Sequence, residues 1–194
     1  MQEYHDKEWG VPVHDERKIF EFLILEGAQA GLSWSTILNR RDGYRKAFLN
    51  FDPKKVSKYD ERKKQQLMND AGIIRNRLKI KAAVNNAKAF LETAEEFGSF
   101  DKYVWQFVNG KTIKNKFKSH KEIPTVTKEA EALSKELKKR GSSFVGPTIM
   151  YAHMQAVGMV NDHTVDCFRY GQMKKQSKGK VRNHATAYRK IDRD

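Results

Sequence analysis

The sequence has 194 residues, with 38 Lys and Arg against 24 Asp and Glu, and its formal net charge of +14 favours a polyanionic partner, nucleic acid above all. The length suits one domain or two small lobes, and the single cysteine, Cys167, excludes an internal disulfide framework and favours a reducing compartment. No apolar run is long enough to span a membrane, and the N-terminus lacks the apolar core of a signal peptide, so we expect a cytoplasmic protein.

Apolar residues recur at helical spacing along most of the chain. Six polar side chains stand where helices are expected to begin: Asp15, Ser33, Asp52, Asp60, Ser99 and Thr127. The longest pattern runs from Ile74 to about Phe97, and the helical pattern after Ser33 is expected to be interrupted at Asp42 and Gly43. Residues 111–126 are polar and are expected to form a loop. No alternating pattern predicts a strand, so the expected fold class is all-α.

Positive charge is concentrated at the end of the chain. Residues 169–194 carry nine Lys or Arg and two Asp or Glu, a net +7, which equals the net charge of the preceding 168 residues. We therefore predict a helical domain over residues 1–168 and a mobile basic tail over residues 169–194. Such a tail either adds salt-sensitive attraction to phosphates or only keeps the protein soluble.

The segment from Arg140 to Thr148 has the outline of a helix-hairpin-helix. A helix is expected to end at Gly141, a short turn follows, and a second helix begins at Pro147 after Gly146. The free N–H groups at the start of that second helix, beside an unobstructed glycine, can hold a DNA phosphate. An ordinary corner between two helices would give the same pattern.

Two further groups of residues have side chains suited to chemistry. If residues 163–167 are helical, His163 and Cys167 share one face, and both are preferred zinc donors, although two ligands do not make a site. Glu26 ends an apolar helix and is followed by a glycine-flanked turn and Trp34. A carboxylate beside aromatic rings suits a cationic or amino-bearing base. The alternatives are a buried Cys beside a capping His, and a surface Glu near a core Trp.

Five stretches, taken together and in this order, resemble the 3-methyladenine DNA glycosylase I family. They are YHDKEWGVP at 4–12, LEGAQAGLSW at 25–34, DAGIIR at 70–75, FVG at 144–146 and VNDH at 160–163. The resemblance implies a helix-hairpin-helix fold of two helical lobes with the damaged base bound between them. It also implies a monofunctional glycosylase that acts on alkylated purines in double-stranded DNA and excises N3-methyladenine.

The same resemblance implies roles for individual side chains. Glu26 is similar to the carboxylate that hydrogen-bonds the methylated adenine, and Tyr4 and Trp34 are similar to the aromatic walls of the pocket. Leu32, with Gln29 nearby, resembles the wedge that fills the gap left in the duplex. Gly146 and Thr148 are further DNA-binding candidates, because they stand at the start of the second hairpin helix described above.

The family also carries a structural zinc, and His5, His163 and Cys167 are similar to three of its four ligands. The family's fourth ligand, a cysteine in an N-terminal segment, has no counterpart here. Water or another side chain would have to complete the tetrahedron, or Met1 is an internal start within a longer natural chain. Because tetrahedral structural sites rarely leave a position open, we expect zinc to be weakly bound or absent.

Two positions bear on the reaction. The wider superfamily commonly has a catalytic Asp where this chain has Asn161, and bifunctional members have a Schiff-base Lys where this chain has Pro147 and Thr148. Simple hydrolysis without lyase chemistry is therefore expected. Asp162 and Asp166 remain nearby carboxylates that the sequence does not exclude.

The glycosylase is the preferred interpretation, acting as a monomer. A catalytically weak DNA-binding module of the same fold is the first alternative, because loss of a zinc site would loosen the part of the chain that carries Tyr4. A basic RNA-associated protein ranks last, since the sequence lacks the pattern of base-stacking aromatic residues on strands.

Overall fold

The structure, a computed structural model, describes residues 1–176, and the part of the predicted tail from 177 to 194 lies outside the described residues. The helices are, in chain order, α1 (Gln2–Lys7), α2 (Glu16–Gln29), α3 (Trp34–Leu38), α4 (Arg41–Ala47), α5 (Pro53–Val56), α6 (Glu61–Met68), α7 (Arg77–Phe97), α8 (Phe100–Trp105), α9 (Lys128–Lys139), α10 (Pro147–Ala156) and α11 (Phe168–Gln176). Short 3-10 turns occur at Leu49–Phe51, Gln106–Val108 and His120–Glu122. The predicted all-α class is confirmed in outline, and no helix among the described residues is long and apolar enough to cross a membrane.

Local sequence signals place the helix starts correctly. Each of the six polar residues predicted to begin a helix accepts a hydrogen bond from a backbone N–H of the first turn. Asp15, for example, accepts from the N–H of Lys18 at 2.8 Å, and Thr127 from that of Ala130 at 3.3 Å. These bonds satisfy backbone donors that no helical partner reaches.

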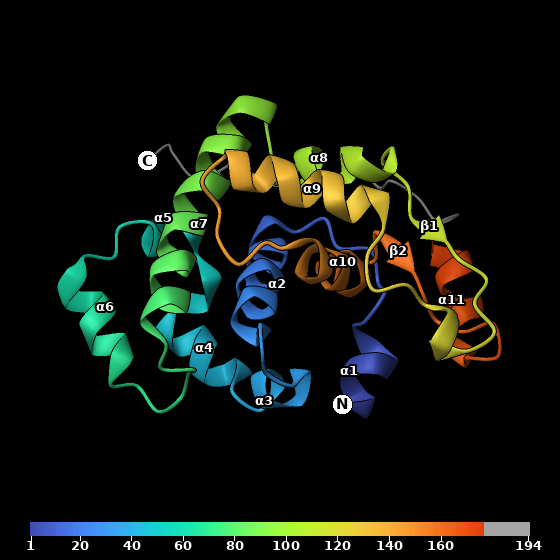
Figure 1. The fold of residues 1–194 in the computed structure, drawn as a ribbon, viewed down its shortest axis with the longest axis horizontal. Helices are drawn as coiled ribbons and strands as arrows, with labels where there is room; N and C mark the ends of the chain where they lie inside the picture. The colour runs from blue at the N-terminus through green and yellow to red at the C-terminus, as the bar shows by residue number, and fades with distance from the viewer. Residues whose placement is uncertain (177–194) are drawn as a thin grey trace, which may run out of the picture.

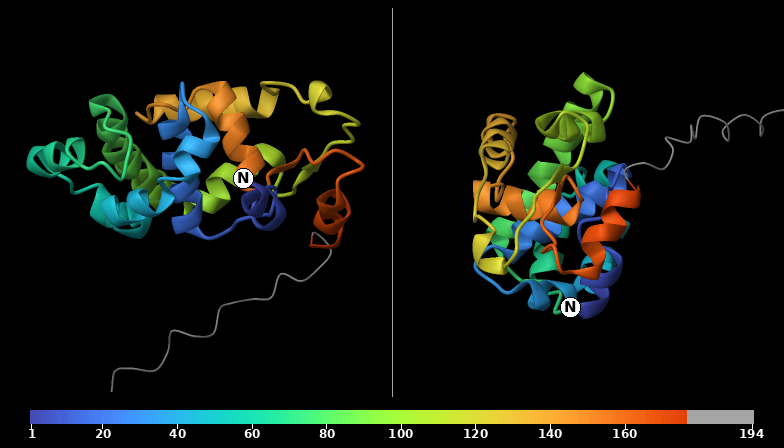
Figure 2. Two further views of the ribbon diagram at one scale, coloured as in Figure 1. Left: turned by 90° about the horizontal axis from the view of Figure 1, so that it is seen from below. Right: turned by 90° about the vertical axis from the view of Figure 1, so that its right-hand side faces the viewer.

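Helix α2 is the axis of the fold. Every residue from Ile19 to Ala28 is buried, so the helix is enclosed on all sides along most of its length. It packs against α7 on one side and α10 on the other, and also contacts α3 and α8 (Figure 1). Helices α6 and α11 lie at opposite ends of the molecule (Figure 2). A functional group near the end of α2 therefore sits between the two halves of the fold.

The predicted interruption at Asp42 and Gly43 is wrong, because both residues lie inside α4. A Cβ atom at position 43 would overlap the carbonyl oxygen of Gly72. The glycine is thus required for the close approach of two backbones, and it does not break the helix.

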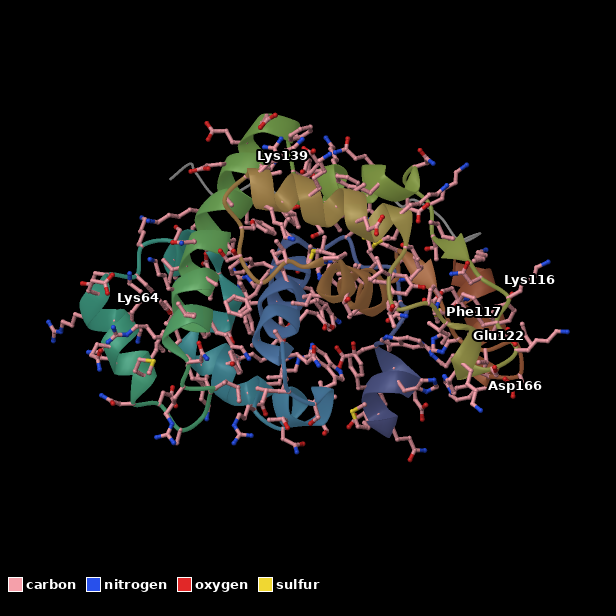
Figure 3. The ribbon with its side chains drawn as sticks, in the orientation of Figure 1. Lys64, Lys116, Phe117, Glu122, Lys139 and Asp166 are labelled. Carbon is pink, nitrogen blue, oxygen red and sulfur yellow. The ribbon has the colours of Figure 1, made fainter. Side chains whose placement is uncertain are left out.

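The structure corrects the prediction that the chain has no strand. Within the described residues, β1 (Ile113–Lys114) and β2 (Val160–Asn161) pair in parallel. Two residues are too few to produce an alternating pattern in the sequence. The pair brings the loop after β1 alongside the segment after β2, and the N–H of Val165 donates to the carbonyl of Phe117 at 2.9 Å. Phe117 and Asp166 lie together at this outer edge of the molecule (Figure 3).

The N-terminal segment is tied to the end of α10, more than 140 residues away in the sequence. The N–H of Gly10 donates to the carbonyl of Gln155 at 3.1 Å, and that of Val13 donates to the carbonyl of Val157 at 3.0 Å. A Cβ atom at Gly158 would overlap the backbone of Val11, so the two segments touch directly. These contacts hold α1 against α10.

The predicted start of the basic tail at residue 169 is too early. Helix α11 includes Phe168–Gln176, and Tyr170 and Met173 are buried. Because its apolar residues pack against the rest of the fold, this segment is part of the domain despite its positive charge.

The Gly43 contact gives a test of the packing. We expect Gly43→Ala to lower the free energy of unfolding by roughly 1–3 kcal/mol, because the new methyl group overpacks the α4 contact. Gly171→Ala in α11, where a Cβ atom meets nothing within 4 Å, should be neutral or stabilising. Urea denaturation measures both, and wild-type stability of Gly43→Ala would contradict the close approach.

Candidate functional site

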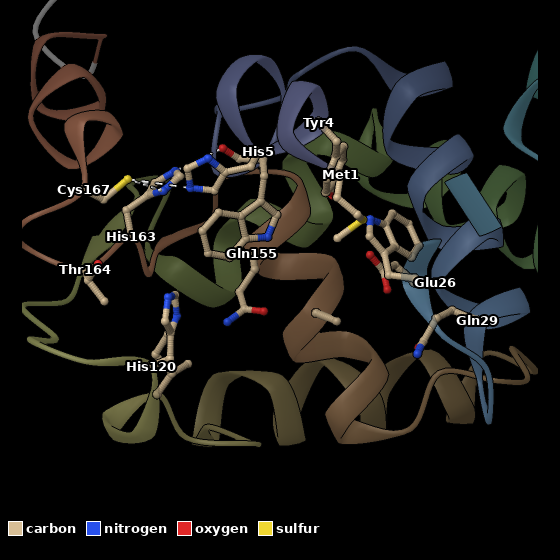
Figure 4. Close-up of a pocket in the computed structure, with 14 residues that line it drawn as sticks. Met1, Tyr4, His5, Glu26, Gln29, His120, Gln155, His163, Thr164 and Cys167 are labelled. Atoms are coloured by element: carbon tan, nitrogen blue, oxygen red, sulfur yellow. Dashed lines mark hydrogen bonds between the residues drawn. The ribbon is translucent and has the colours of Figure 1, made fainter. Parts of the chain in front are cut away.

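A cavity of about 670 Å³ opens between α1, the end of α2, the start of α3 and α10. Glu26, Gln29 and Trp34 line it from one side, and His163 and Cys167 line it from the other. Figure 4 shows Tyr4 and Glu26 at one end of the cavity, with Gln155 between them and the other end, where His5, His163 and Cys167 lie. The cavity therefore joins the predicted base pocket to the predicted metal ligands.

Glu26 lies on the last turns of α2 and is only 4% exposed. Within residues 1–176 its carboxyl group has no ion-pair or hydrogen-bond partner. Burial alone raises the pKa of this carboxyl to about 8, because the ionised form is poorly solvated. The group is therefore mostly protonated near neutral pH, and a positively charged ligand would favour its ionised form.

Aromatic rings enclose this carboxyl. Tyr4, on α1, and Trp34, the first residue of α3, are tilted against each other with ring centroids 5.5 Å apart. Burial and the neighbouring Glu26 raise the pKa of the Tyr4 hydroxyl. The Nε1 atom of Trp34 is buried without a hydrogen-bond partner in the described part of the chain. An unpaired buried donor costs about 1–3 kcal/mol, which a ligand with a suitable acceptor would recover.

The turn that connects α2 to α3 carries the predicted wedge. Gln29 lines the cavity and its side-chain amide donates to the carbonyl of Leu32, while Gly31 takes a left-handed conformation with φ of 76°. Leu32 does not line the cavity and is 37% exposed. An apolar side chain thus projects into solvent beside the cavity.

The predicted hairpin connects α9 and α10 as expected, with Gly141 in the left-handed region at φ of 84°. Its turn is fixed by Asn86 of α7, whose side chain donates to the carbonyl of Ser143 at 2.9 Å and accepts from the N–H of Ser143 at 2.8 Å. Gly146 caps α10, and a Cβ atom there meets nothing within 4 Å. Gly146 and Thr148 lie outside the cavity lining, so the hairpin is a separate surface.

Three predicted metal ligands converge. His5, His163 and Cys167 place their donor atoms within 4.8 Å of one another, and the sulfur of Cys167 lies 3.6 Å from His5 Nε2 and from His163 Nδ1. Tetrahedral zinc with ordinary bond lengths separates nitrogen and sulfur ligands by about 3.5 Å. Residues 163–167 are not helical but form a turn before α11, so it is this turn, and not a shared helix face, that brings His163 and Cys167 together.

In His5 and His163, the ring nitrogen that does not face the Cys167 sulfur forms a hydrogen bond of its own. His163 Nε2 donates to the carbonyl of Trp9 at 3.2 Å, and His5 Nδ1 donates to the Asp6 carboxylate at 2.7 Å. Burial lowers the pKa of His163 to about 4, so its ring is neutral. Metal-binding histidines typically donate their second nitrogen to an oxygen in this way. The three side chains therefore fit a zinc ion.

Sequence reasoning missed the group that fixes α1. Arg41 of α4 donates to both oxygens of Glu8 at 2.8 and 2.9 Å, and to Glu21 of α2 at 2.8 Å. Glu8 directly follows α1, so this buried guanidinium positions Tyr4 against α2. The three residues are 13 or more positions apart, and no local pattern in the sequence joins them.

The two carboxylates that the sequence did not exclude from the reaction, Asp162 and Asp166, do not line the cavity. Asp162 is buried and accepts hydrogen bonds from Asn115 at 2.6 Å, from Gln155 at 2.8 Å and from the hydroxyl of Tyr151. Asp166 lies at the outer edge of the molecule (Figure 3). Asn161 is fully buried and does not line the cavity.

Known structures share this architecture. A crystal structure of 3-methyladenine DNA glycosylase I has a TM-score of 0.83 with this chain, at 49% identity, and covers 86% of this chain and 92% of that one. A second structure, a tyrosine-to-phenylalanine variant of 3-methyladenine DNA glycosylase I in complex with 3-methyladenine, has a TM-score of 0.84 at 37% identity, covering 86% and 89%. The fold is thus that of the helical DNA glycosylases.

Sequence comparison gives the family. DNA-3-methyladenine glycosylase 1 of Escherichia coli (strain K12) is 51% identical over 167 residues, which are 86% of this chain and 89% of that protein. The profile of the methyladenine glycosylase family matches residues 1–170. The chain belongs to the methyladenine glycosylase family, as the resemblance predicted.

The raised pKa of Glu26 predicts a pH dependence of stability. The folded state keeps the proton up to about pH 8, whereas the unfolded carboxyl loses it near pH 4.5, so stability falls as pH rises between these values. Glu26→Gln removes this titration. The free energy of unfolding of Glu26→Gln, relative to that of the wild type, should therefore be higher at pH 9 than at pH 5 by roughly 4 kcal/mol.

Denaturant titrations at several pH values measure this shift. The control is Glu92→Gln on the exposed face of α7, which should follow the wild type at every pH. Parallel curves for wild type and Glu26→Gln would contradict a buried, protonated carboxyl.

Proposed function

We propose that the protein excises N3-methyladenine from alkylated double-stranded DNA by hydrolysis. The observation that carries this proposal is the buried Glu26 carboxyl enclosed by Tyr4 and Trp34 in a cavity large enough for a purine. Membership of the methyladenine glycosylase family and the likeness to a relative solved with 3-methyladenine support it.

The enzyme must first take the base out of the duplex. Extrusion costs a few kcal/mol, and less where damage weakens pairing, which itself favours a lesion. Stacking on Tyr4 and Trp34 returns roughly 1–3 kcal/mol for each contact. Leu32, exposed beside the cavity, enters the gap that the base leaves. The hairpin around Gly146 holds a phosphate through the open start of α10.

Glu26 recognises the extruded base. An N3-methylated adenine in the nucleoside is a cation, and it presents exocyclic amino protons that a carboxylate accepts. Entry of this cation favours loss of the proton from Glu26, because the positive charge stabilises the ionised carboxylate that burial alone disfavours. Attraction to the cation does not itself accelerate the reaction, since only binding that strengthens in the transition state does so. Glu26 therefore acts mainly in selectivity.

The reaction needs little further assistance. The positive charge on the base has already weakened the glycosidic bond, and the base leaves as a neutral molecule, so no acid has to protonate it. As the bond to the base breaks, its electron pair stays with the base and neutralises it, while water adds to the sugar carbon and loses a proton to solvent. Pro147 and Thr148 offer no amine at the start of α10, so no Schiff base forms and the abasic strand stays intact.

Release of free base tests the proposal. At DNA concentrations well below saturation, we expect Glu26→Ala to reduce the release of 3-methyladenine from methylated duplex DNA by about 10- to 100-fold, because capture of the base loses a charge-assisted hydrogen bond worth roughly 1.5–3 kcal/mol. Chromatography of the released bases measures the rate, with Glu92→Ala as the matched control. Wild-type protein that binds methylated DNA without releasing base would instead indicate a DNA-binding module, and structured RNA that displaces the DNA would indicate an RNA-associated protein.

We also propose that His5, His163 and Cys167 hold a structural zinc. The bound ion would join α1, which carries Tyr4, to the turn before α11. These three side chains supply one ligand fewer than a closed tetrahedral site, so binding should be weaker than in a four-ligand site.

Metal binding can be measured directly. Zinc should bind with a stoichiometry of about one per chain and should raise the melting temperature, since it binds only the folded arrangement. Cys167→Ser should weaken zinc affinity at least tenfold, as judged by competition with a colorimetric chelator, whereas Asp166→Asn should not. Equal affinity in wild type and Cys167→Ser would exclude this site.

A further inference from the structure

One lysine of α7 reaches across to the end of α2. The Nζ atom of Lys79 donates to the backbone carbonyls of Ala28 at 2.8 Å and Ala30 at 2.7 Å. These carbonyls belong to the last turn of α2 and the residue that follows it, 49 to 51 positions earlier in the sequence. The contact joins α7 to α2 at the point where the chain turns towards α3.

The contact supplies what the end of α2 lacks. The last turn of α2 contains no basic residue of its own, and Ala30 leaves the helical conformation with ψ of 117°. The final carbonyls of a helix have no intrahelical partner and lie at the negative end of its dipole. The ammonium group of Lys79 therefore satisfies two of these acceptors and also interacts favourably with the dipole. No carboxylate within the described residues forms an ion pair with Lys79.

Lys79 is itself held in place. Its backbone N–H donates to the side chain of Asn76, the cap of the 21-residue helix α7, at 3.1 Å. Seven residues after Lys79 on the same helix, Asn86 fixes the hairpin turn through Ser143. A single rigid helix thus supports both the α2–α3 turn and the hairpin turn.

We propose that Lys79 is a positioning residue that holds the α2–α3 turn, and with it Leu32, in place beside the cavity. The inference rests on the proposed function, because the turn matters only when a base is extruded from a duplex. The pocket side chains are fixed by other contacts: Glu26 by the burial of α2, Tyr4 by the Arg41 ion pairs, and Trp34 by α3, whose cap at Ser33 and fully buried Ile37 hold that helix in place. Loss of Lys79 therefore affects capture of the base from duplex DNA and spares the pocket itself.

This division predicts a split between two measurements. In Lys79→Met, release of 3-methyladenine from methylated duplex DNA should fall roughly 10- to 100-fold, because a small displacement of a group that positions the substrate has an effect of this size. The dissociation constant for free 3-methyladenine, measured by calorimetry, should stay within about twofold of the wild type, since the pocket keeps its contacts.

Two further variants complete the test. Lys79→Arg retains a cation with several donors and should restore release to within about threefold of the wild type. Lys88→Met removes the same charge from an exposed position on α7 and should leave both measurements unchanged. Thermal melts of all variants check that the fold is retained.

Each outcome separates the two proposals. If wild-type protein releases no base, the proposed function fails. If the wild type is active and Lys79→Met releases base at the wild-type rate, the role of Lys79 alone is refuted. It is also refuted if Lys79→Met weakens binding of the free base as much as it slows release, because Lys79 would then support the whole pocket.

Discussion

The site depends on a carboxyl group that the fold buries without a compensating positive charge. Glu26 can occupy this position only because α2 is enclosed by apolar residues on both sides and holds it there. Desolvation keeps the Glu26 carboxyl mostly protonated near pH 7, so the cost of burying its charge arises only when a ligand can offset it. Under the proposed function, this property lets the pocket favour a cationic purine over the neutral purines that surround it in DNA.

The walls of the pocket come from parts of the chain that are far apart. Tyr4 reaches Glu26 because Arg41 links the end of α1 to α2, and because the segment after α1 is bonded to the end of α10. Lys79 makes the corresponding link on the other side, from α7 to the end of α2. Cations that bind carboxylates or backbone carbonyls thus set the positions of the two elements that flank the cavity.

Local signals in the sequence predicted the helix starts, since a cap such as Asp15 or Thr127 interacts with residues three positions away. The family resemblance placed Glu26 and Trp34 in one pocket. The contacts of Gly43, by contrast, depend on a backbone 29 residues later, which no local pattern reveals. The short β1–β2 pair and the packing of α11 were missed for the same reason: their stabilising partners are distant in the sequence.

The bonds between residues 10–13 and residues 155–157 also have a consequence for synthesis on the ribosome. Helix α1 cannot take its final place until residues 155–157, more than 140 positions later, have been translated. Tyr4, the aromatic wall that α1 carries, is therefore put in place only after α2 and α7 have been synthesised and have had time to associate. A partly synthesised chain lacks a finished pocket, and the late closure of such a long loop is an entropically costly step in folding.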